Sequence, residues 1–124
     1  MKTKSPKGIK KKAGANATIK QATRKITLNK LCENVSEDKK FLVANGEILS
    51  NIWDLIHLLD NIDDYTFYHH VSDEKNDFYN WIKEMYGDGE FEKVVLPIRN
   101  PQKLEIAILK YIINMLSKDK QFNL

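Results

Sequence analysis

The chain contains no acidic residue before Glu33 and no aromatic residue before Phe41. Its first 30 residues nevertheless carry ten basic side chains, whereas the remaining 94 residues carry 10 basic and 17 acidic ones. The modest net charge of +3 therefore divides into +10 for the N-terminal segment and −7 for the rest of the chain. A charge separation of this size indicates charged partners, and it is more informative about function than any catalytic motif in the sequence.

Cysteine and long apolar runs are also scarce. A single cysteine, Cys32, excludes an intramolecular disulfide and a cysteine-based zinc site, which is typical of a reducing compartment. No stretch reaches the roughly 20 apolar residues of a membrane-spanning helix, because charged and amide side chains interrupt the richest one, residues 104–116. Lys10, Lys11 and Lys12 stand where a signal peptide would have its apolar core. We therefore expect a cytoplasmic protein that engages no membrane.

The length of 124 residues fits a single domain. Because the first 40 residues have no aromatic side chain, they cannot form a core by themselves. We predict a basic, largely disordered arm over residues 1–35, in which residues 17–35 form at most a weak helix against a partner. Residues 36–124 are predicted to form one small helical domain.

The predicted domain is mainly α, with four to five short helices and a short N-terminal β-hairpin. Asn45 and Gly46 lie between two apolar runs, a pattern that favours a two-residue hairpin turn with positive φ at both positions. Ser50 is the predicted N-cap of a helix that runs to about Asn61. Asp63 and Asp64 are candidate caps for a short helix that ends near residue 70.

Two further helices are predicted between residues 76 and 96. Asn76 or Asp77 caps a helix that presents Phe78 and Trp81 on one face. Gly87 is expected to close that helix in the left-handed conformation, and Asp88 to start a short helix that reaches about residue 96.

Asn100 and Pro101 mark the start of the last helix, which is predicted to run to about Lys118. Its polar stripe is narrow, because apolar residues cover most of its circumference. Such a helix is either the central core element or part of an oligomer interface. The sequence therefore does not decide whether the protein forms a homo-oligomer through this last helix.

One segment carries a recognisable pattern. Residues 41–95 contain Phe67-Tyr68-His69-His70-Val71, then Asn76-Asp77-Phe78-x-x-Trp81, then Gly87-Asp88. This order of motifs resembles the DUF5752 family of small domains, whose hallmark is a His-Val step followed by Asn-Asp-Phe-x-x-Trp and Gly-Asp. The resemblance covers a little under half the chain and implies a small, mainly helical domain without an established activity.

The same residues also have a purely structural interpretation. Asn76 and Asp77 stand where a helix needs caps, Phe78 and Trp81 would pack its first turns, and Gly87 would end it. His70 precedes this capping loop and is expected to hydrogen-bond Asp77 or a loop carbonyl.

A small enzyme is a weaker hypothesis. It would use His69 or His70 as a general base oriented by Asp77, with nearby carboxylates such as Asp73, Glu74 or Asp88 holding a substrate or a divalent ion. A metal site built from His57, His69 and His70 is disfavoured, because adjacent helical residues point in different directions. We predict a non-catalytic protein with no metal and no cofactor.

The basic arm is the clearest functional candidate. Its cations can neutralise several phosphates, and the release of counterions would make binding fall steeply with salt. Without aromatic residues, base stacking by the arm is not expected, so affinity without sequence specificity is predicted, for RNA or DNA or a ribonucleoprotein. The predicted nucleic-acid-binding residues are Lys2, Lys4, Lys7, Lys10, Lys11, Lys12, Lys20, Arg24, Lys25 and Lys30.

The rest of the chain has the opposite character. Residues 54–92 contain 11 acidic and two basic side chains, a surface that would repel nucleic acid and attract a basic protein. The leading hypothesis is an interaction module that its arm anchors to nucleic acid. The alternative is a protein–protein adaptor in which the arm only improves solubility.

Overall fold

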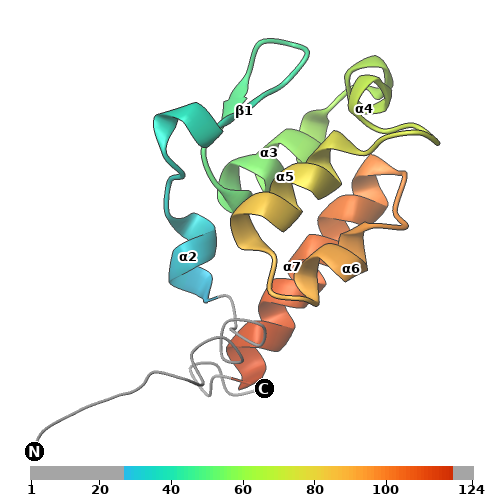
Figure 1. Cartoon of the computed structure of the whole chain (residues 1–124). Helices are drawn as coiled ribbons and strands as arrows, with labels where there is room; N and C mark the ends of the chain where they lie inside the picture. The colour runs from blue at the N-terminus through green and yellow to red at the C-terminus, as the bar shows by residue number, and fades with distance from the viewer. Residues whose placement is uncertain (1–26, 119–124) are drawn as a thin grey trace, which may run out of the picture.

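A computed structural model describes residues 27–118 of the chain (Figure 1). Residues 1–26, which include most of the predicted arm, and residues 119–124 lie outside the described residues. Within the described part the fold is mainly helical, with a short antiparallel hairpin, as predicted. None of its helices combines the length and apolar content that a membrane span requires.

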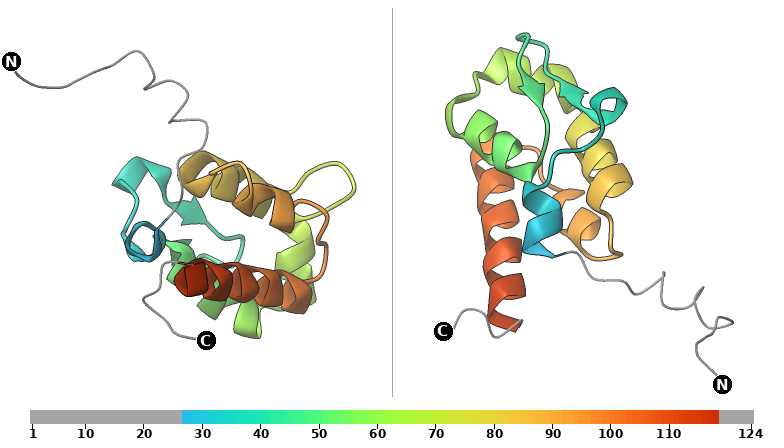
Figure 2. Two further views of the ribbon diagram at one scale, coloured as in Figure 1. Left: turned by 90° about the horizontal axis from the view of Figure 1, so that it is seen from below. Right: turned by 90° about the vertical axis from the view of Figure 1, so that its left-hand side faces the viewer.

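The elements follow one another closely along the chain. In order they are α2 (Leu28–Cys32), the 3₁₀ turn η2 (Glu37–Lys39), β1 (Phe41–Leu42), β2 (Ile48–Leu49), α3 (Ile52–Asn61), α4 (Asp64–His70), α5 (Asp77–Tyr86), α6 (Phe91–Val95) and α7 (Pro101–Lys118). Helix α7 packs against α2, α3 and α6, while α5 packs against α6 (Figures 1 and 2). The hairpin and α4 lie together at one end of this assembly (Figure 1).

The packed domain begins earlier than the predicted boundary between residues 35 and 36. Helix α2 is capped by the Thr27 side chain, which accepts a hydrogen bond from the Lys30 N–H. Leu31 is buried in the common core, and the Val35 N–H donates to the Ser50 carbonyl. Two leucines in a basic segment are too weak a pattern to indicate this packing, because the elements that α2 contacts are the distant helices α3 and α7.

The hairpin is present, but its turn differs from the prediction. The Gly46 N–H donates to the Val43 carbonyl, and the Val43 N–H donates to the Glu47 carbonyl. The loop therefore has three residues, with Ala44 and Asn45 at the turn centre and Gly46 following with φ of 97°. A turn of this kind followed by a left-handed glycine is the common three-residue hairpin loop.

Asparagine caps three of the helices. Asn51, and not Ser50, caps α3 by accepting from the Asp54 N–H, while Asp54 accepts from the Ser50 N–H. Asn76 caps α5, and Asn100 accepts from Lys103 N–H in the first turn of α7. Asp63 caps α4 as predicted. Each such cap satisfies an amide that has no partner inside the helix.

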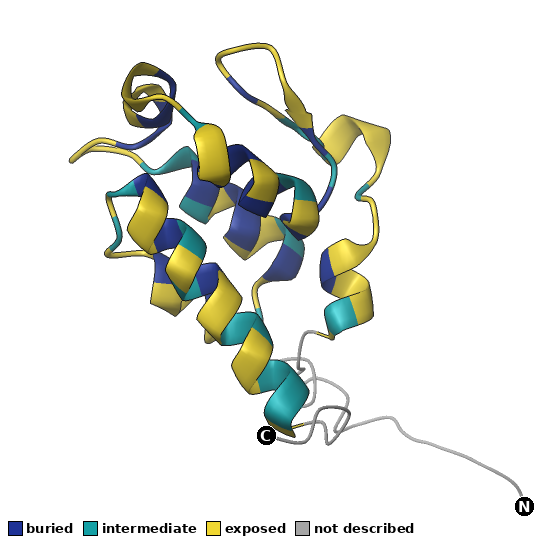
Figure 3. Ribbon diagram, turned by 180° about the vertical axis from the view of Figure 1, so that it is seen from behind, coloured by how far each residue is buried: buried dark blue, intermediate teal, exposed yellow. Residues whose placement is uncertain are grey.

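Each helix from α2 to α7, together with β2, contributes buried side chains to one core. Its largest fully buried side chains are Tyr86, Phe67, Phe78 and Phe91. In α7 only Pro101, Leu104 and Ile108 are buried, so this helix is not the central core element. Figure 3 shows the opposite side of α7 carrying mostly exposed and half-buried residues.

Candidate functional site

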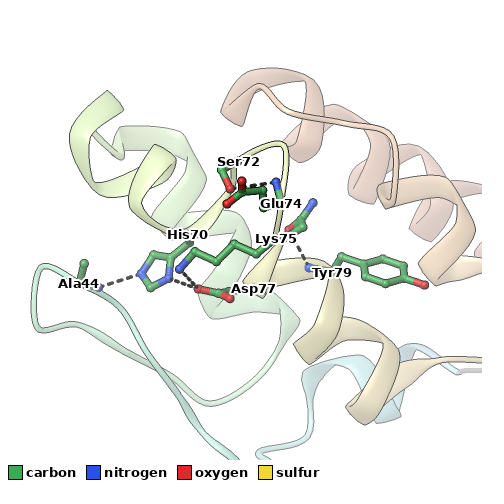
Figure 4. A network of polar contacts seen from close by, with 8 residues as sticks. Ala44, His70, Ser72, Glu74, Lys75, Asp77 and Tyr79 are labelled. Carbon is green, nitrogen blue, oxygen red and sulfur yellow. Dashed lines mark hydrogen bonds and ion pairs between the residues drawn. The ribbon is translucent and has the colours of Figure 1, made fainter.

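His70 joins the hairpin to the start of α5 (Figure 4). Its Nε2 accepts a hydrogen bond from the Ala44 N–H at 3.0 Å, and its Nδ1 lies 2.9 Å from Asp77 Oδ2. Because an amide N–H can only donate, Nε2 carries no proton here, and the ring proton on Nδ1 is donated to Asp77. His70 is 6% exposed. Both of its ring nitrogens are therefore engaged by groups of the protein itself.

Asp77 is held by two partners. Besides His70, the Lys75 ammonium lies 3.2 Å from the same carboxylate oxygen (Figure 4). Burial alone would raise the pKa of Asp77, but the hydrogen bonds from His70 and Lys75 and the charge of Lys75 outweigh it. The pKa of Asp77 is therefore lowered, and its charged form is the one that the network stabilises.

The loop between α4 and α5 is fixed at both ends. Val71 and Asn76 form an isolated antiparallel bridge, and the Ser72 N–H donates to the Lys75 carbonyl at 2.8 Å. The Arg99 guanidinium donates to the Ser72 carbonyl at 2.7 Å and so ties the loop to the segment before α7. These contacts position Lys75 and Asp77 beside His70.

An aromatic cluster surrounds the histidine. Phe41 of β1 stacks on Phe78, with 5.1 Å between ring centroids, and meets His70 and Trp81 edge-on. Trp81 is 7% exposed and donates its indole N–H to the Lys39 carbonyl at 2.8 Å. The structure thus brings together the motif residues His70, Asp77, Phe78 and Trp81. Their contacts join the hairpin and η2 to α5.

Gly87 has a different role from the one predicted. Its φ is −64°, so it is not left-handed, and the positive φ of 94° belongs to Gly89 instead. A Cβ at Gly87 would lie 2.5 Å from the Lys83 carbonyl oxygen. Glycine is required there because the backbone passes too close to the end of α5 for any side chain.

Asp88 links two helices. Its Oδ1 accepts from the N–H groups of Glu90 and Phe91 at the start of α6, and its Oδ2 accepts from the Tyr111 hydroxyl of α7. Tyr111 also stacks on Phe91, with 4.5 Å between ring centroids. Burial, the hydrogen bond to Asp88 and nearby carboxylates raise the pKa of the Tyr111 hydroxyl.

The remaining candidate ligands are dispersed. His57 is exposed and packs edge-on against Trp53, and His69 is exposed beside the buried His70. Among residues 27–118, no group of three or more His, Cys, Asp or Glu side chains is arranged to hold a metal ion. Asp73 lies at the surface, 3.5 Å from the Arg99 guanidinium.

Of the predicted nucleic-acid-binding residues, only Lys30 falls within the described part of the chain. Its side chain is exposed, and its ammonium lies 4.0 Å from the Glu33 carboxylate. The other nine, from Lys2 to Lys25, lie outside the described residues. Seven of the 11 acidic residues between positions 54 and 92 are exposed, so the folded part presents the acidic surface that the sequence indicates.

The structure also shows a buried polar group that no sequence pattern indicates. Tyr86 is 1% exposed, and its hydroxyl has no hydrogen-bond partner in the described structure. Burial, together with the charges of Asp54, Cys32 and Glu33, raises the pKa of this hydroxyl. Helix α7 also has an exposed apolar stripe that includes Ile106, Leu109 and Ile113; the sequence shows that this helix is apolar but not which of its residues remain exposed. A shallow groove of about 290 Å³ also runs along α7, lined by Val94, Lys103, Ile106, Ala107, Lys110, Tyr111 and Asn114.

No protein-family model matches the chain, and neither a curated protein nor a solved structure is detectably similar to it. The resemblance to the DUF5752 family stays a prediction from the motif residues.

Proposed function

We propose that this protein is a non-catalytic interaction module whose basic N-terminal arm anchors it to RNA or DNA, alone or within a ribonucleoprotein. The observation that carries the proposal is the charge distribution: ten basic and no acidic side chains in the first 30 residues. Such a segment gains affinity for phosphates through counterion release. A cytoplasmic location is part of the proposal.

In this proposal the arm and the folded part contact different partners. Its exposed carboxylates between positions 54 and 92 would repel a phosphate backbone, so contact with nucleic acid falls to the arm. Both ring nitrogens of His70 bind groups of the protein, which supports a structural role for this histidine. The acidic surface is then available for a basic protein partner.

The test is a binding titration by fluorescence anisotropy with duplex DNA and structured RNA. We compare the chain with a Lys10→Gln/Lys11→Gln/Lys12→Gln variant at about 50 and 200 mM salt, where phosphate contacts lose affinity steeply. The matched control is Lys83→Gln/Lys93→Gln/Lys118→Gln, which removes the same charge from exposed positions of the folded part. The arm variant should bind about tenfold or more weakly and with a smaller salt slope, whereas the control should bind like the parent.

Equal losses in the two variants would mean that only net charge matters and would contradict anchoring by the arm. Absence of binding by the parent at low salt would remove the nucleic-acid proposal altogether.

A protein–protein adaptor is the second candidate, favoured by a separate observation. Trp53 on α3 is 56% exposed, and Ile106 and Ile113 on α7 are 51% and 47% exposed. Exposed tryptophan and clustered aliphatic side chains are typical of protein interfaces. Binding partners recovered equally well by the parent and the arm variant would favour this function over anchoring to nucleic acid.

A further inference from the structure

The outer face of α7 carries a regular apolar stripe. Ile106, Leu109 and Ile113 are exposed and Leu116 is half-buried, at successive spacings of three, four and three residues. This spacing places all four on one line along the helix, away from the buried face formed by Leu104 and Ile108. Three of the four side chains, those of Ile106, Leu109 and Ile113, remain exposed in the described part of the chain.

We propose that the stripe binds a second copy of this chain, with the two α7 helices packed in parallel about a two-fold axis. The spacing is that of two heptads, with isoleucine at both first positions and leucine at both fourth positions. In parallel coiled coils this choice of residues favours two strands. Two heptads would be too short for isolated peptides, but each α7 is already folded against its own domain, so helix nucleation adds no cost.

The flanking charges select the parallel orientation. Glu105 immediately precedes Ile106, and Lys110 immediately follows Leu109, so the two charges are five residues apart on opposite sides of the stripe. In a parallel pair, such positions on the two helices face each other, and Glu105 meets Lys110 of the second copy twice. An antiparallel pair with the same apolar register would instead bring the two Lys110 side chains together.

The surroundings of Glu105 fit this partner. Burial raises the pKa of Glu105, as do a hydrogen bond to Asp60 and the charge of Asp60, while His57 opposes the shift. Neither Glu105 nor Lys110 forms an ion pair with another residue of the described chain. A lysine from the second copy would supply the cation that this pair of carboxylates lacks.

Helix α3 extends the same face. Trp53, His57 and Asp60 are spaced four and three residues apart on its exposed side, and the Trp53 ring packs on His57. Because α3 lies beside α7 (Figure 2), a second α7 on the stripe also reaches this side of α3. The large exposed tryptophan then becomes part of the interface, as interface tryptophans commonly do.

Sedimentation equilibrium of the full chain, freed of nucleic acid, tests the proposal over about 10–500 μM protein, the range in which a small interface dimerises. The parent should form dimers. Lys110→Glu and Glu105→Lys should each weaken dimerisation about tenfold or more, and combining them should restore it. Lys93→Glu, the same charge change at an exposed site on α6, is the matched control and should leave the dimer unchanged.

Ile113→Asp provides an independent test, because its exposed position allows the monomer to keep its fold, as circular dichroism would verify. It should abolish the dimer. A parent that stays monomeric throughout, a double charge variant that fails to restore the dimer, or an equal effect of Lys93→Glu would each overturn the proposal. The arm variant with Lys10, Lys11 and Lys12 replaced should still dimerise, so this inference and the nucleic-acid proposal can fail separately.

Discussion

Replacing His70 with alanine should destabilise the domain substantially, because one side chain connects three segments. The substitution removes the hydrogen bonds to Ala44 N–H and Asp77, each worth about 1 kcal/mol, and leaves the part-buried Ala44 N–H without an acceptor, which costs about 1–3 kcal/mol. It also removes the ring that packs against Phe41 and Phe78. The expected loss is about 3–5 kcal/mol of unfolding free energy.

The variant His70→Gln distinguishes the contributions of the two hydrogen bonds to stability. A glutamine amide can accept from Ala44 N–H near the position of Nε2 but cannot also keep the contact with Asp77, so we expect a smaller loss of about 1–2 kcal/mol. Urea unfolding followed by tryptophan fluorescence measures both variants. With a slope of about 1–1.5 kcal/mol/M for a domain of this size, His70→Ala should lower the midpoint by about 2–5 M.

The outcome distinguishes a structural histidine from a ligand-binding one. A loss below about 1 kcal/mol for His70→Ala would refute the reasoning, because groups kept for binding commonly contribute little to stability or oppose it. A glutamine variant as unstable as the alanine variant would show that the ring packing, and not the Ala44 acceptor, carries the effect.

Four further predictions concern individual side chains of the fold. Gly87→Ala and Gly87→Asn should each lower the free energy of unfolding in urea by about 2 kcal/mol or more, because any Cβ clashes with the Lys83 carbonyl. Gly46→Asn should lower it by less than about 1 kcal/mol, since asparagine tolerates positive φ and the space around Gly46 is open. Equal costs for Gly46→Asn and Gly87→Asn would contradict this distinction. Trp81→Ala should cost about 3–5 kcal/mol by thermal or urea unfolding, and near-normal stability would place the side chain on a working surface instead. The pKa of Asp77 is lowered in the folded state, so its carboxylate contributes stability at pH values above the ordinary aspartate pKa of about 4. This stability is lost as pH falls through the folded pKa. Asp77→Asn should therefore make the free energy of unfolding less dependent on pH in the acid range. The hydroxyls of Tyr86 and Tyr111 have raised pKa values, so stability should also fall as pH rises above about 10, and Tyr111→Phe should reduce that alkaline loss.

Local patterns were sufficient to predict several elements. The starts of α4 and α7 follow from Asp63 and from Asn100-Pro101, because a cap is decided by residues three positions apart. The contact between His70 and Asp77 was predictable for the same reason, since both flank one short loop. The exclusion of disulfides and the charge separation between the arm and the rest of the chain are properties of composition alone.

Other features depend on contacts between distant segments. The acceptor role of His70 towards the Ala44 N–H is one of them, because these two residues lie 26 positions apart in the chain. The packing of Leu31 and the hydrogen bond from Trp81 to Lys39 likewise need partners that no local pattern names.

For α7, the sequence by itself determined a helix with apolar side chains around most of its circumference. Only the tertiary structure decided which of them form the core, because α2, α3 and α6 cover one face and leave Ile106, Leu109 and Ile113 exposed. Hydrophobicity fixes how much apolar surface must be buried, whereas the arrangement of neighbouring elements fixes which part of it remains for a partner.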